Sequence, residues 1–237
     1  MIPISLYEHT NSISFEEKKH IYTVNGEIYE SGTRFIKKFT LPFDTELHSS
    51  RVAKKEGVSQ EEIIERWDFE RDSSTIRGNG IHKYVEDRQR GFIVRPPNKI
   101  VIKHYQDLEK FLREKDITRI FNEFRVCSHK LKIAGTMDAL YWKDGKFSIL
   151  DWKTNKKIST DNPYKKFCKY PFNKIPDTEL GHYYLQINLY RYMIEGVVGN
   201  DMIGEDHYVV HFPHEGDMKV FDVPNLQKEM GIVANFS

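Results

Sequence analysis

Two aspartates and a lysine near the middle of the chain have the types and spacing expected of a metal site. Asp144-Gly145 lies between stretches of alternating apolar residues, a pattern that predicts a β-hairpin with a two-residue turn. In the register set by that turn, Asp138 is opposite Asp151. Because side chains alternate along a strand, Lys153 lies on the same face as Asp151. Two carboxylates and an ammonium are therefore expected to converge at one end of the hairpin.

Paired carboxylates of this kind are unfavourable unless a cation lies between them. Two negative charges about 5 Å apart repel by roughly 3 kcal/mol at an effective dielectric constant of about 20. Leu140, Ile149 and Leu150 place apolar side chains on both faces beside the aspartates, so the hairpin is expected inside a sheet. A surface hairpin with two solvated aspartates is the alternative, and the apolar flanks favour a bound divalent cation instead.

A third carboxylate, Glu123, reaches the same face only if the turn before the hairpin has the right length. Residues 120–127 alternate as a strand that leads into the hairpin. With an even number of turn residues, Glu123 falls on the face of Asp138, because register and face are coupled with period two. An odd number would place Glu123 on the opposite face, where a surface arginine would pair with it. The sequence leaves both arrangements open.

A helix that begins near residue 77 presents a histidine and a glutamate on one face. Gly78 and Gly80 lead into it, and His82 and Glu86 are four residues apart, one above the other. Glycines at this point allow another backbone or a phosphate to approach closely. A lone histidine at a helix start is more often structural than a ligand, so this segment alone does not decide the role of His82.

A second helix is expected from Glu179, where an apolar stripe with helical period continues to Gly196. His182, Gln186 and Tyr190 step by four along one side of it. Core packing with polar tips at the edge is the alternative to a role in the site, and for Tyr190 alone it is the simpler interpretation.

The segment after Lys153 combines cations with aromatic rings. Cations contact phosphates and rings stack on unpaired bases, so this composition suits single-stranded nucleic acid. A charged run is usually only a solvated loop, but the connection to the candidate metal site favours a loop that contacts substrate. The residues expected to bind nucleic acid are Lys156, Lys157, Tyr164, Lys165, Lys166 and Lys169.

The remaining segments predict ordinary structural elements. They are an N-terminal hairpin over residues 13–29 with its turn at Asn25-Gly26, a short helix to Phe39, a helix opened by Ser59 and Glu62, a helix over 100–115, strands over 208–212 and 219–223, and a helix after Pro224.

Composition limits the classes of protein to which the chain can belong. With 237 residues and 39% hydrophobic content, it is long enough for one core with some elaboration. The net charge of +1 gives no overall attraction to nucleic acid, so any such affinity must come from local clusters. Cys127 and Cys168 are too few for a zinc ribbon or a four-cysteine iron–sulfur cluster. The chain has neither a membrane-length apolar run nor a secretory signal pattern, so we expect no membrane partner and an intracellular, cytoplasmic location.

Four of these segments together resemble the PD-(D/E)XK nuclease superfamily, and within it the RecB-type exonucleases, which include phage recombination exonucleases and mitochondrial genome maintenance exonuclease. Each motif alone is weak, whereas four in order are strong. The match covers about residues 77–212, and Met137 stands where the superfamily name has proline. In chain order the matching residues are Gly78 with His82, Gly135 with Asp138, Asp151-Trp152-Lys153, and Gln186 with Tyr190.

The resemblance implies an α/β fold with a central mixed β-sheet flanked by helices. This is a restriction-endonuclease-like core in the order helix, three strands, helix, strand. Residues 77–237 would form the nuclease core, and residues 1–76 an N-terminal hairpin and helical elaboration of the same domain.

The resemblance also implies a metal-dependent DNA exonuclease that hydrolyses phosphodiester bonds in recombination, repair or replication, in the host cytoplasm if the chain is phage-encoded. Its catalytic residues would be Asp138, Asp151, Lys153, Glu123, Gln186 and Tyr190. One or two Mg²⁺ or Mn²⁺ ions would be bound by His82, Asp138, Asp151 and the Trp152 carbonyl, with no iron–sulfur cluster.

DNA with a free end and single-stranded character is the expected partner, together with recombination or replication proteins. Two alternatives remain at this point. One is a catalytically silent nucleic-acid-binding module, and the other is a structure-specific endonuclease of the same fold.

Overall fold

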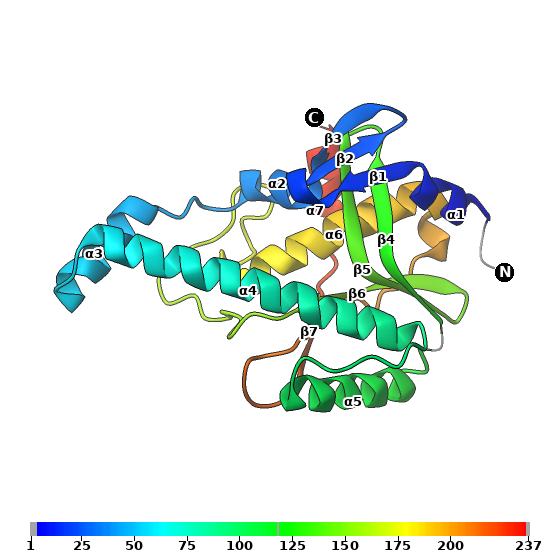
Figure 1. Cartoon of the computed structure of the whole chain (residues 1–237). Coiled ribbons are helices and arrows are strands. Elements are labelled where there is room, and N and C mark those ends of the chain that lie inside the picture. Colours follow the sequence, from blue (N-terminus) through cyan, green and yellow to red (C-terminus); the bar gives the residue numbers. More distant parts are fainter. Residues whose placement is uncertain (1–3, 118, 236–237) are drawn as a thin grey trace.

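One mixed β-sheet organises the chain, and helices cover both of its faces (Figure 1). The computed structural model describes residues 4–117 and 119–235, and within them eight strands form the sheet. The strands are β1 (Ile13–Glu16), β2 (Ile21–Val24), β3 (Glu27–Ser31), β4 (Arg119–Ser128), β5 (Ile133–Lys143), β6 (Lys146–Lys153), β7 (Tyr208–His211) and β8 (Lys219–Asp222). The α/β fold predicted from the sequence is confirmed.

The helices are α1 (Ile4–Asn11), α2 (Gly32–Ile36), α3 (Thr45–Glu56), α4 (Gln60–Gln89), α5 (Lys99–Glu114), α6 (Glu179–Val198) and α7 (Gln227–Asn235). Short 3₁₀ helices cover Glu17–Lys19, Lys37–Phe39 and Asn200–Met202. Among the described helices, none is both long and apolar enough to cross a membrane.

The strand order is β1-β2-β3-β5-β6-β7-β8, and β4 pairs along the other edge of β5. Most pairs are antiparallel, but β3 with β5 and β6 with β7 are parallel. β3 pairs with Ile133 and Ala134 of β5, whereas β6 pairs with residues 139–143. The stretch 135–138 of β5 therefore lies between two neighbours on the same edge, which is where Asp138 occurs.

Both predicted hairpins are present with the predicted turns. Leu140 pairs with Ile149 in the central hairpin, and its turn residues Asp144 and Gly145 have φ angles of 49° and 81°. Positive φ at both positions is what a two-residue turn needs to match the twist of its strands. The N-terminal hairpin turns in the same way at Asn25-Gly26.

Two apolar cores lie on opposite faces of the sheet. On one face, strand residues such as Met137 and Ile149 pack with α6, α7, α1 and α2. On the other face, Leu150 and Trp152 pack with α4 and α5. Because Ile149 and Leu150 are neighbours that face opposite cores, β6 is buried on both sides, as predicted for a strand inside the sheet.

The long helix α4 differs from what the sequence predicted, because one 30-residue helix replaces two expected ones. Ser59 caps its start, and Gly78 and Gly80 lie inside it and not at a helix start. A glycine inside a helix costs about 1 kcal/mol relative to alanine. A Cβ on Gly78 would lie 3.0 Å from Thr154 Oγ1, so this glycine allows α4 to approach the end of β6.

Candidate active site

The alternation of side chains in β4 and β5 is interrupted at the same point in both strands. Phe121 and Phe124 of β4 both pack into the core on the α6 side, although they are three residues apart, and Met137 and Leu140 of β5 do the same. Between them Glu123 has a φ of 52°, which is unusual for a residue other than glycine. Pairing continues in one register on both sides of this break. Such irregularities re-aim side chains and are common beside active sites.

The break brings Glu123 and Asp138 together. The turn between β4 and β5 has an even number of residues, 129–132, so the condition under which Glu123 joins Asp138 is met. The β5–β6 ladder ends at Ala139 with Leu150, however, and the predicted direct pairing of Asp138 with Asp151 is not part of it. The Asp138 carboxylate instead contacts His82 of α4 and the Trp152 N–H of β6.

His82, Glu123 and Asp138 form a group that could hold a metal ion. One ligand atom from each lies within 4.8 Å of the others. His82 Nδ1 is 3.2 Å from Asp138 Oδ1, and the Trp152 backbone N–H donates to Asp138 Oδ2 over 2.7 Å. These three residues come from α4, β4 and β5, so the site requires the helix and both strands to pack as they do.

Asp151 lies beside this group and is paired with Lys153. Lys153 Nζ is 2.7 Å from Asp151 Oδ2, and both side chains are largely buried, with 16% and 3% exposed. Lys153 also donates to Gln186 Oε1 over 3.3 Å, and Gln186 Nε2 donates to the Tyr190 hydroxyl over 3.0 Å. A chain of polar contacts therefore runs from β6 into α6 and fixes the position of the ammonium.

The protonation of His82, Asp138 and Glu123 is set by opposing effects. Burial lowers the pKa of His82, but the Asp138 carboxylate outweighs it, and the pKa is raised overall. Burial likewise favours neutral Asp138, yet His82 and Lys153 hold its pKa below the usual value. Loss of solvent around the carboxylate, and then the charge of Asp138, raise the pKa of Glu123 to about 7, although the residue as a whole stays exposed. A divalent cation bound here would add a counter-charge for both carboxylates and favour their ionised forms.

The pKa values of Asp151 and Lys153 are set mainly by burial and by their mutual attraction, because both side chains are almost fully buried. Burial raises the pKa of Asp151 to about 6 even though the Lys153 ammonium acts in the opposite direction. For Lys153, burial lowers the pKa, but Asp151 and Asp138 outweigh it and raise the pKa overall. Lys153 therefore remains a cation inside the site, where a charge acts more strongly than in water.

Two tyrosines of α6 pack against the strands that carry the site. The ring of Tyr183 lies 4.5 Å from Lys153 Nζ, and its hydroxyl donates to Asn155. Tyr190 is buried, and a Cβ on Gly135 would lie 2.5 Å from its ring, so Gly135 allows the ring to pack against β5. Sequence reasoning missed Tyr183, although its place three residues before Gln186 puts it on the same helix face.

The predicted nucleic-acid residues lie in the loop between β6 and α6. Lys156, Lys157, Lys165, Lys166 and Lys169 are exposed, and Tyr164 is 82% exposed. The loop is not free of the body, because the Lys169 N–H donates to the Phe39 carbonyl over 2.7 Å. Phe172, in the same loop, is buried in the core.

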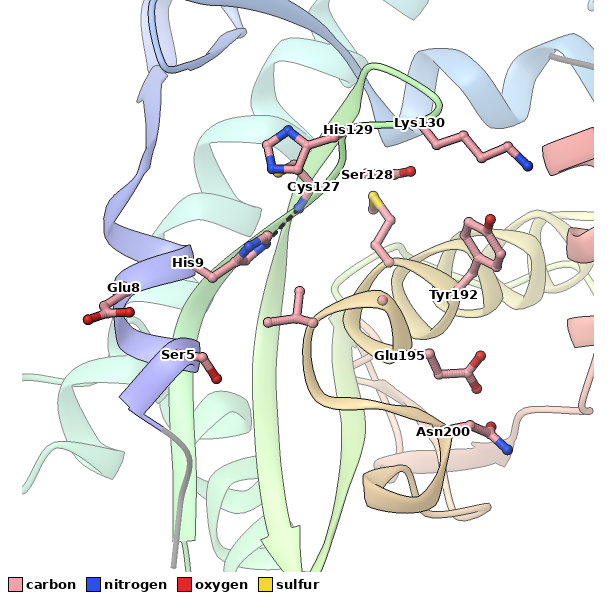
Figure 2. Close-up of a pocket in the computed structure, with 13 residues that line it drawn as sticks. Ser5, Glu8, His9, Cys127, Ser128, His129, Lys130, Tyr192, Glu195 and Asn200 are labelled. Carbon is pink, nitrogen blue, oxygen red and sulfur yellow. Dashed lines mark hydrogen bonds between the residues drawn. The ribbon is translucent and has the colours of Figure 1, made fainter.

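A separate cavity of about 740 Å³ lies between α1, the end of β4 and the C-terminal end of α6 (Figure 2). Its dashed contact is the hydrogen bond from the Cys127 N–H to His9 Nε2, 3.2 Å long. None of its lining residues belongs to the group around Asp138.

No family model matches the chain. No curated protein matches it either. Among solved structures, the crystal structure of SSO0001 aligns with 14% identity over 55% of this chain and 53% of that chain, with a TM-score of 0.32. A crystal structure of a "putative exonuclease" from Eubacterium rectale aligns with 15% identity over 68% of this chain and 64% of that chain, with a TM-score of 0.41. The chain therefore spans between about half and two thirds of those proteins, and neither likeness is close enough to assign a function.

Proposed function

We propose that this protein is a metal-dependent deoxyribonuclease of the PD-(D/E)XK type, and more specifically an exonuclease. The observation that carries the proposal is the convergence of His82, Glu123 and Asp138 beside the buried pair of Asp151 and Lys153. These residues come from four separate elements, and a core that needed only stability would not collect three carboxylates around one histidine and one lysine.

The donor groups fit Mg²⁺ or Mn²⁺. Carboxylate oxygens suit hard divalent cations, and one imidazole makes Mn²⁺ a suitable substitute. Asp151 Oδ2 is buried and lies 2.7 Å from the Lys153 ammonium, and a carboxylate can accept from that ammonium and still offer a further lone pair to a metal. His82, Asp138 and Asp151 would bind the ion, with the Trp152 carbonyl as a further ligand and Glu123 available for a second ion.

When bound, the metal would lower the pKa of a water and offset charge on the scissile phosphate. Lys153 would donate hydrogen bonds to the attacking water and to the phosphate oxygens as their charge grows. Gln186 holds the Lys153 ammonium on one side. Tyr190 is buried and reaches Lys153 only through Gln186, so its role would be to position that pair.

The exposed lysines and Tyr164 after β6 would bind the DNA strand that enters this site. Their loop begins at residue 154, directly after Lys153, so a bound strand would lie next to the catalytic group. Cations and exposed rings together favour unpaired DNA near the site.

The test is cleavage of labelled DNA in the presence of Mg²⁺ or Mn²⁺. We expect cleavage by the wild type that EDTA abolishes. Asp151→Asn should lower the rate by at least about 100-fold while DNA binding is retained, because a ligand and a charge are lost with little change in shape.

The matched control is Asp144→Asn, which removes the same charge from the exposed hairpin turn and should cleave like the wild type. Far-UV circular dichroism checks that both variants fold. Cleavage that survives EDTA would contradict the mechanism. DNA binding without cleavage by the wild type would instead identify a silent binding module.

A further inference from the structure

We propose a second metal site, distinct from the nuclease centre, in which Cys168, Asp177 and His182 bind Zn²⁺. One ligand atom from each of these residues lies within 4.8 Å of the others. Cys168 Sγ is 3.8 Å from Asp177 Oδ1, and His182 Nε2 is 2.7 Å from the same oxygen. The three residues share no member with the group around Asp138.

The spacing is close to what a tetrahedral zinc ion requires. With a Zn–S distance of about 2.3 Å and Zn–O and Zn–N distances of about 2.0 Å, neighbouring ligand atoms are roughly 3.3–3.5 Å apart. The two measured distances lie on either side of that range, so small side-chain rotations would suffice. The Pro176 carbonyl oxygen, 3.9 Å from Cys168 Sγ, or a water could occupy the fourth position.

The backbone holds the three ligands in place without help from a metal. The Asp177 N–H donates to the Lys166 carbonyl, and the Cys168 N–H donates to the Ile175 carbonyl over 2.9 Å, so the loop is paired like a short hairpin. His182 is in the first turn of α6. Such a preformed arrangement lowers the cost of ordering the ligands when a metal binds.

The ligand chemistry separates this site from the nuclease centre. Thiolate and imidazole ligands select zinc-like metals, whereas the carboxylate-rich nuclease centre suits Mg²⁺ or Mn²⁺. The His182 side chain is 36% exposed, which provides an entry path, while those of Cys168 and Asp177 are buried or nearly so.

A cysteine nucleophile is the competing interpretation of this cluster, and the order of contacts argues against it. An activated cysteine needs a histidine base next to its sulfur. Here Asp177 lies between the two, and its carboxylate would oppose thiolate formation unless a cation were bound.

A metal at this position would fasten the loop of residues 154–178, the lysine-rich loop, to the start of α6. Cys168 lies in the loop among the exposed residues Lys166, Phe167 and Lys169, whereas His182 belongs to the rigid helix. The proposed zinc site is therefore structural, and it would hold the candidate DNA-contact residues of the loop at a fixed place relative to α6.

Cobalt titration of the metal-free full-length protein under reducing conditions tests the proposal, because Co²⁺ bound to a thiolate gives a sulfur-to-metal charge-transfer band. We expect this band to saturate at one Co²⁺ per chain and to disappear when Zn²⁺ displaces the cobalt. Cys168→Ser should abolish the band, and His182→Ala should weaken Co²⁺ binding by about 10-fold or more.

Cys127→Ser and Asp151→Asn serve as controls and should both keep the band, since the first removes the other cysteine and the second disables the nuclease centre. His182→Ala changes a partly exposed side chain, so it keeps the test valid even if Cys168→Ser fails to fold. Absence of the band in the wild type, or its persistence in Cys168→Ser, would overturn the site.

Discussion

His207 shows how a single buried side chain can make stability depend on pH. The residue is 3% exposed, and its Nδ1 accepts a hydrogen bond from the Ile149 N–H over 3.0 Å, which requires that nitrogen to be unprotonated. Burial, and then the nearby Arg191 charge, lower the pKa of His207 to about 3. In the unfolded chain the pKa returns to about 6.5.

The sign of the effect follows from proton uptake. Between about pH 6.5 and pH 3 the unfolded state binds a proton at this position and the folded state does not, so the free energy of unfolding falls as the pH falls. The contribution of His207 to the free energy of unfolding is complete above about pH 6.5. Below that pH the free energy of unfolding falls by up to about 1.4 kcal/mol per pH unit.

His207→Asn should flatten this dependence, because asparagine keeps an acceptor for the Ile149 N–H but does not titrate. Denaturant unfolding at several values between pH 7 and pH 4.5 measures the slope. His20→Asn, on an exposed histidine, should retain the wild-type slope. Equal slopes in the His207 variant and the wild type would refute the assignment.

Residue types were easier to predict than residue geometry. Asp138, Asp151 and Lys153 could be proposed as a group because a two-residue turn fixes the hairpin register. The break at Glu123 could not be foreseen, because it depends on how two strands pack together against α6. Cys168, Asp177 and His182 were missed as a cluster, since the loop that brings them together has no periodic pattern.

At the scale of elements, turn and cap residues in the sequence predicted where helices and strands end, but they did not predict that α4 continues through its glycines as one helix. The turns at residues 25–26 and 144–145 were predicted correctly, as was the cap at Ser59. The helix break expected near Gly78 is absent, because the buried contacts of Ile81 and Val85 offset the cost of the glycines. Neither α1 nor the parallel pairing of β3 with β5 had a signal in the sequence analysis, and a pairing of that kind is set by tertiary packing.

The loop between β6 and α6 yields a prediction about salt dependence. Lys165 and Lys166 are exposed, and each contact with a DNA phosphate would release a condensed counterion. Replacing both by alanine should weaken binding of single-stranded DNA. The slope of log affinity against log salt should become less negative by up to about 1.4, since each contact with single-stranded DNA contributes about 0.7. Fluorescence anisotropy in the Asp151→Asn background measures binding without cleavage.

The double variant Lys143→Ala with Lys146→Ala is the matched control. These lysines flank the turn of the central hairpin, at the opposite end of β6 from Lys153, and their loss removes the same charge. The control should keep the wild-type slope. If the loop variant keeps it as well, the loop is solvated surface and does not contact DNA.

At the scale of the whole molecule, one feature extends beyond the sheet. α3 packs against the first half of α4, and together they form an arm that projects from the body (Figure 1). The arm exposes Phe69 at 73%, and Ile76, just past the middle of α4, is 75% exposed. In the same view, the lysine-rich loop lies toward the same end of the molecule as the arm.

The proposed preference for DNA ends depends on how a strand reaches Lys153. If the strand has to be threaded past the arm and the loop, a linear strand can enter from its end whereas a closed circle cannot. Apolar and aromatic side chains along such a path would favour unpaired bases. We therefore expect rapid degradation of linear DNA with single-stranded ends and little nicking of circular single-stranded DNA.

A time course with Mg²⁺ on linear single-stranded, linear duplex and circular single-stranded DNA tests this expectation, with each linear substrate labelled in turn at either end. Mononucleotides or short oligomers should appear first from one labelled end, and that end gives the direction of digestion. Asp151→Asn on the same substrates controls for contaminating nucleases. Rapid nicking of the circle would mean that the site accepts internal phosphodiester bonds. The protein would then be an endonuclease, with the same residues around Asp138 as its metal centre.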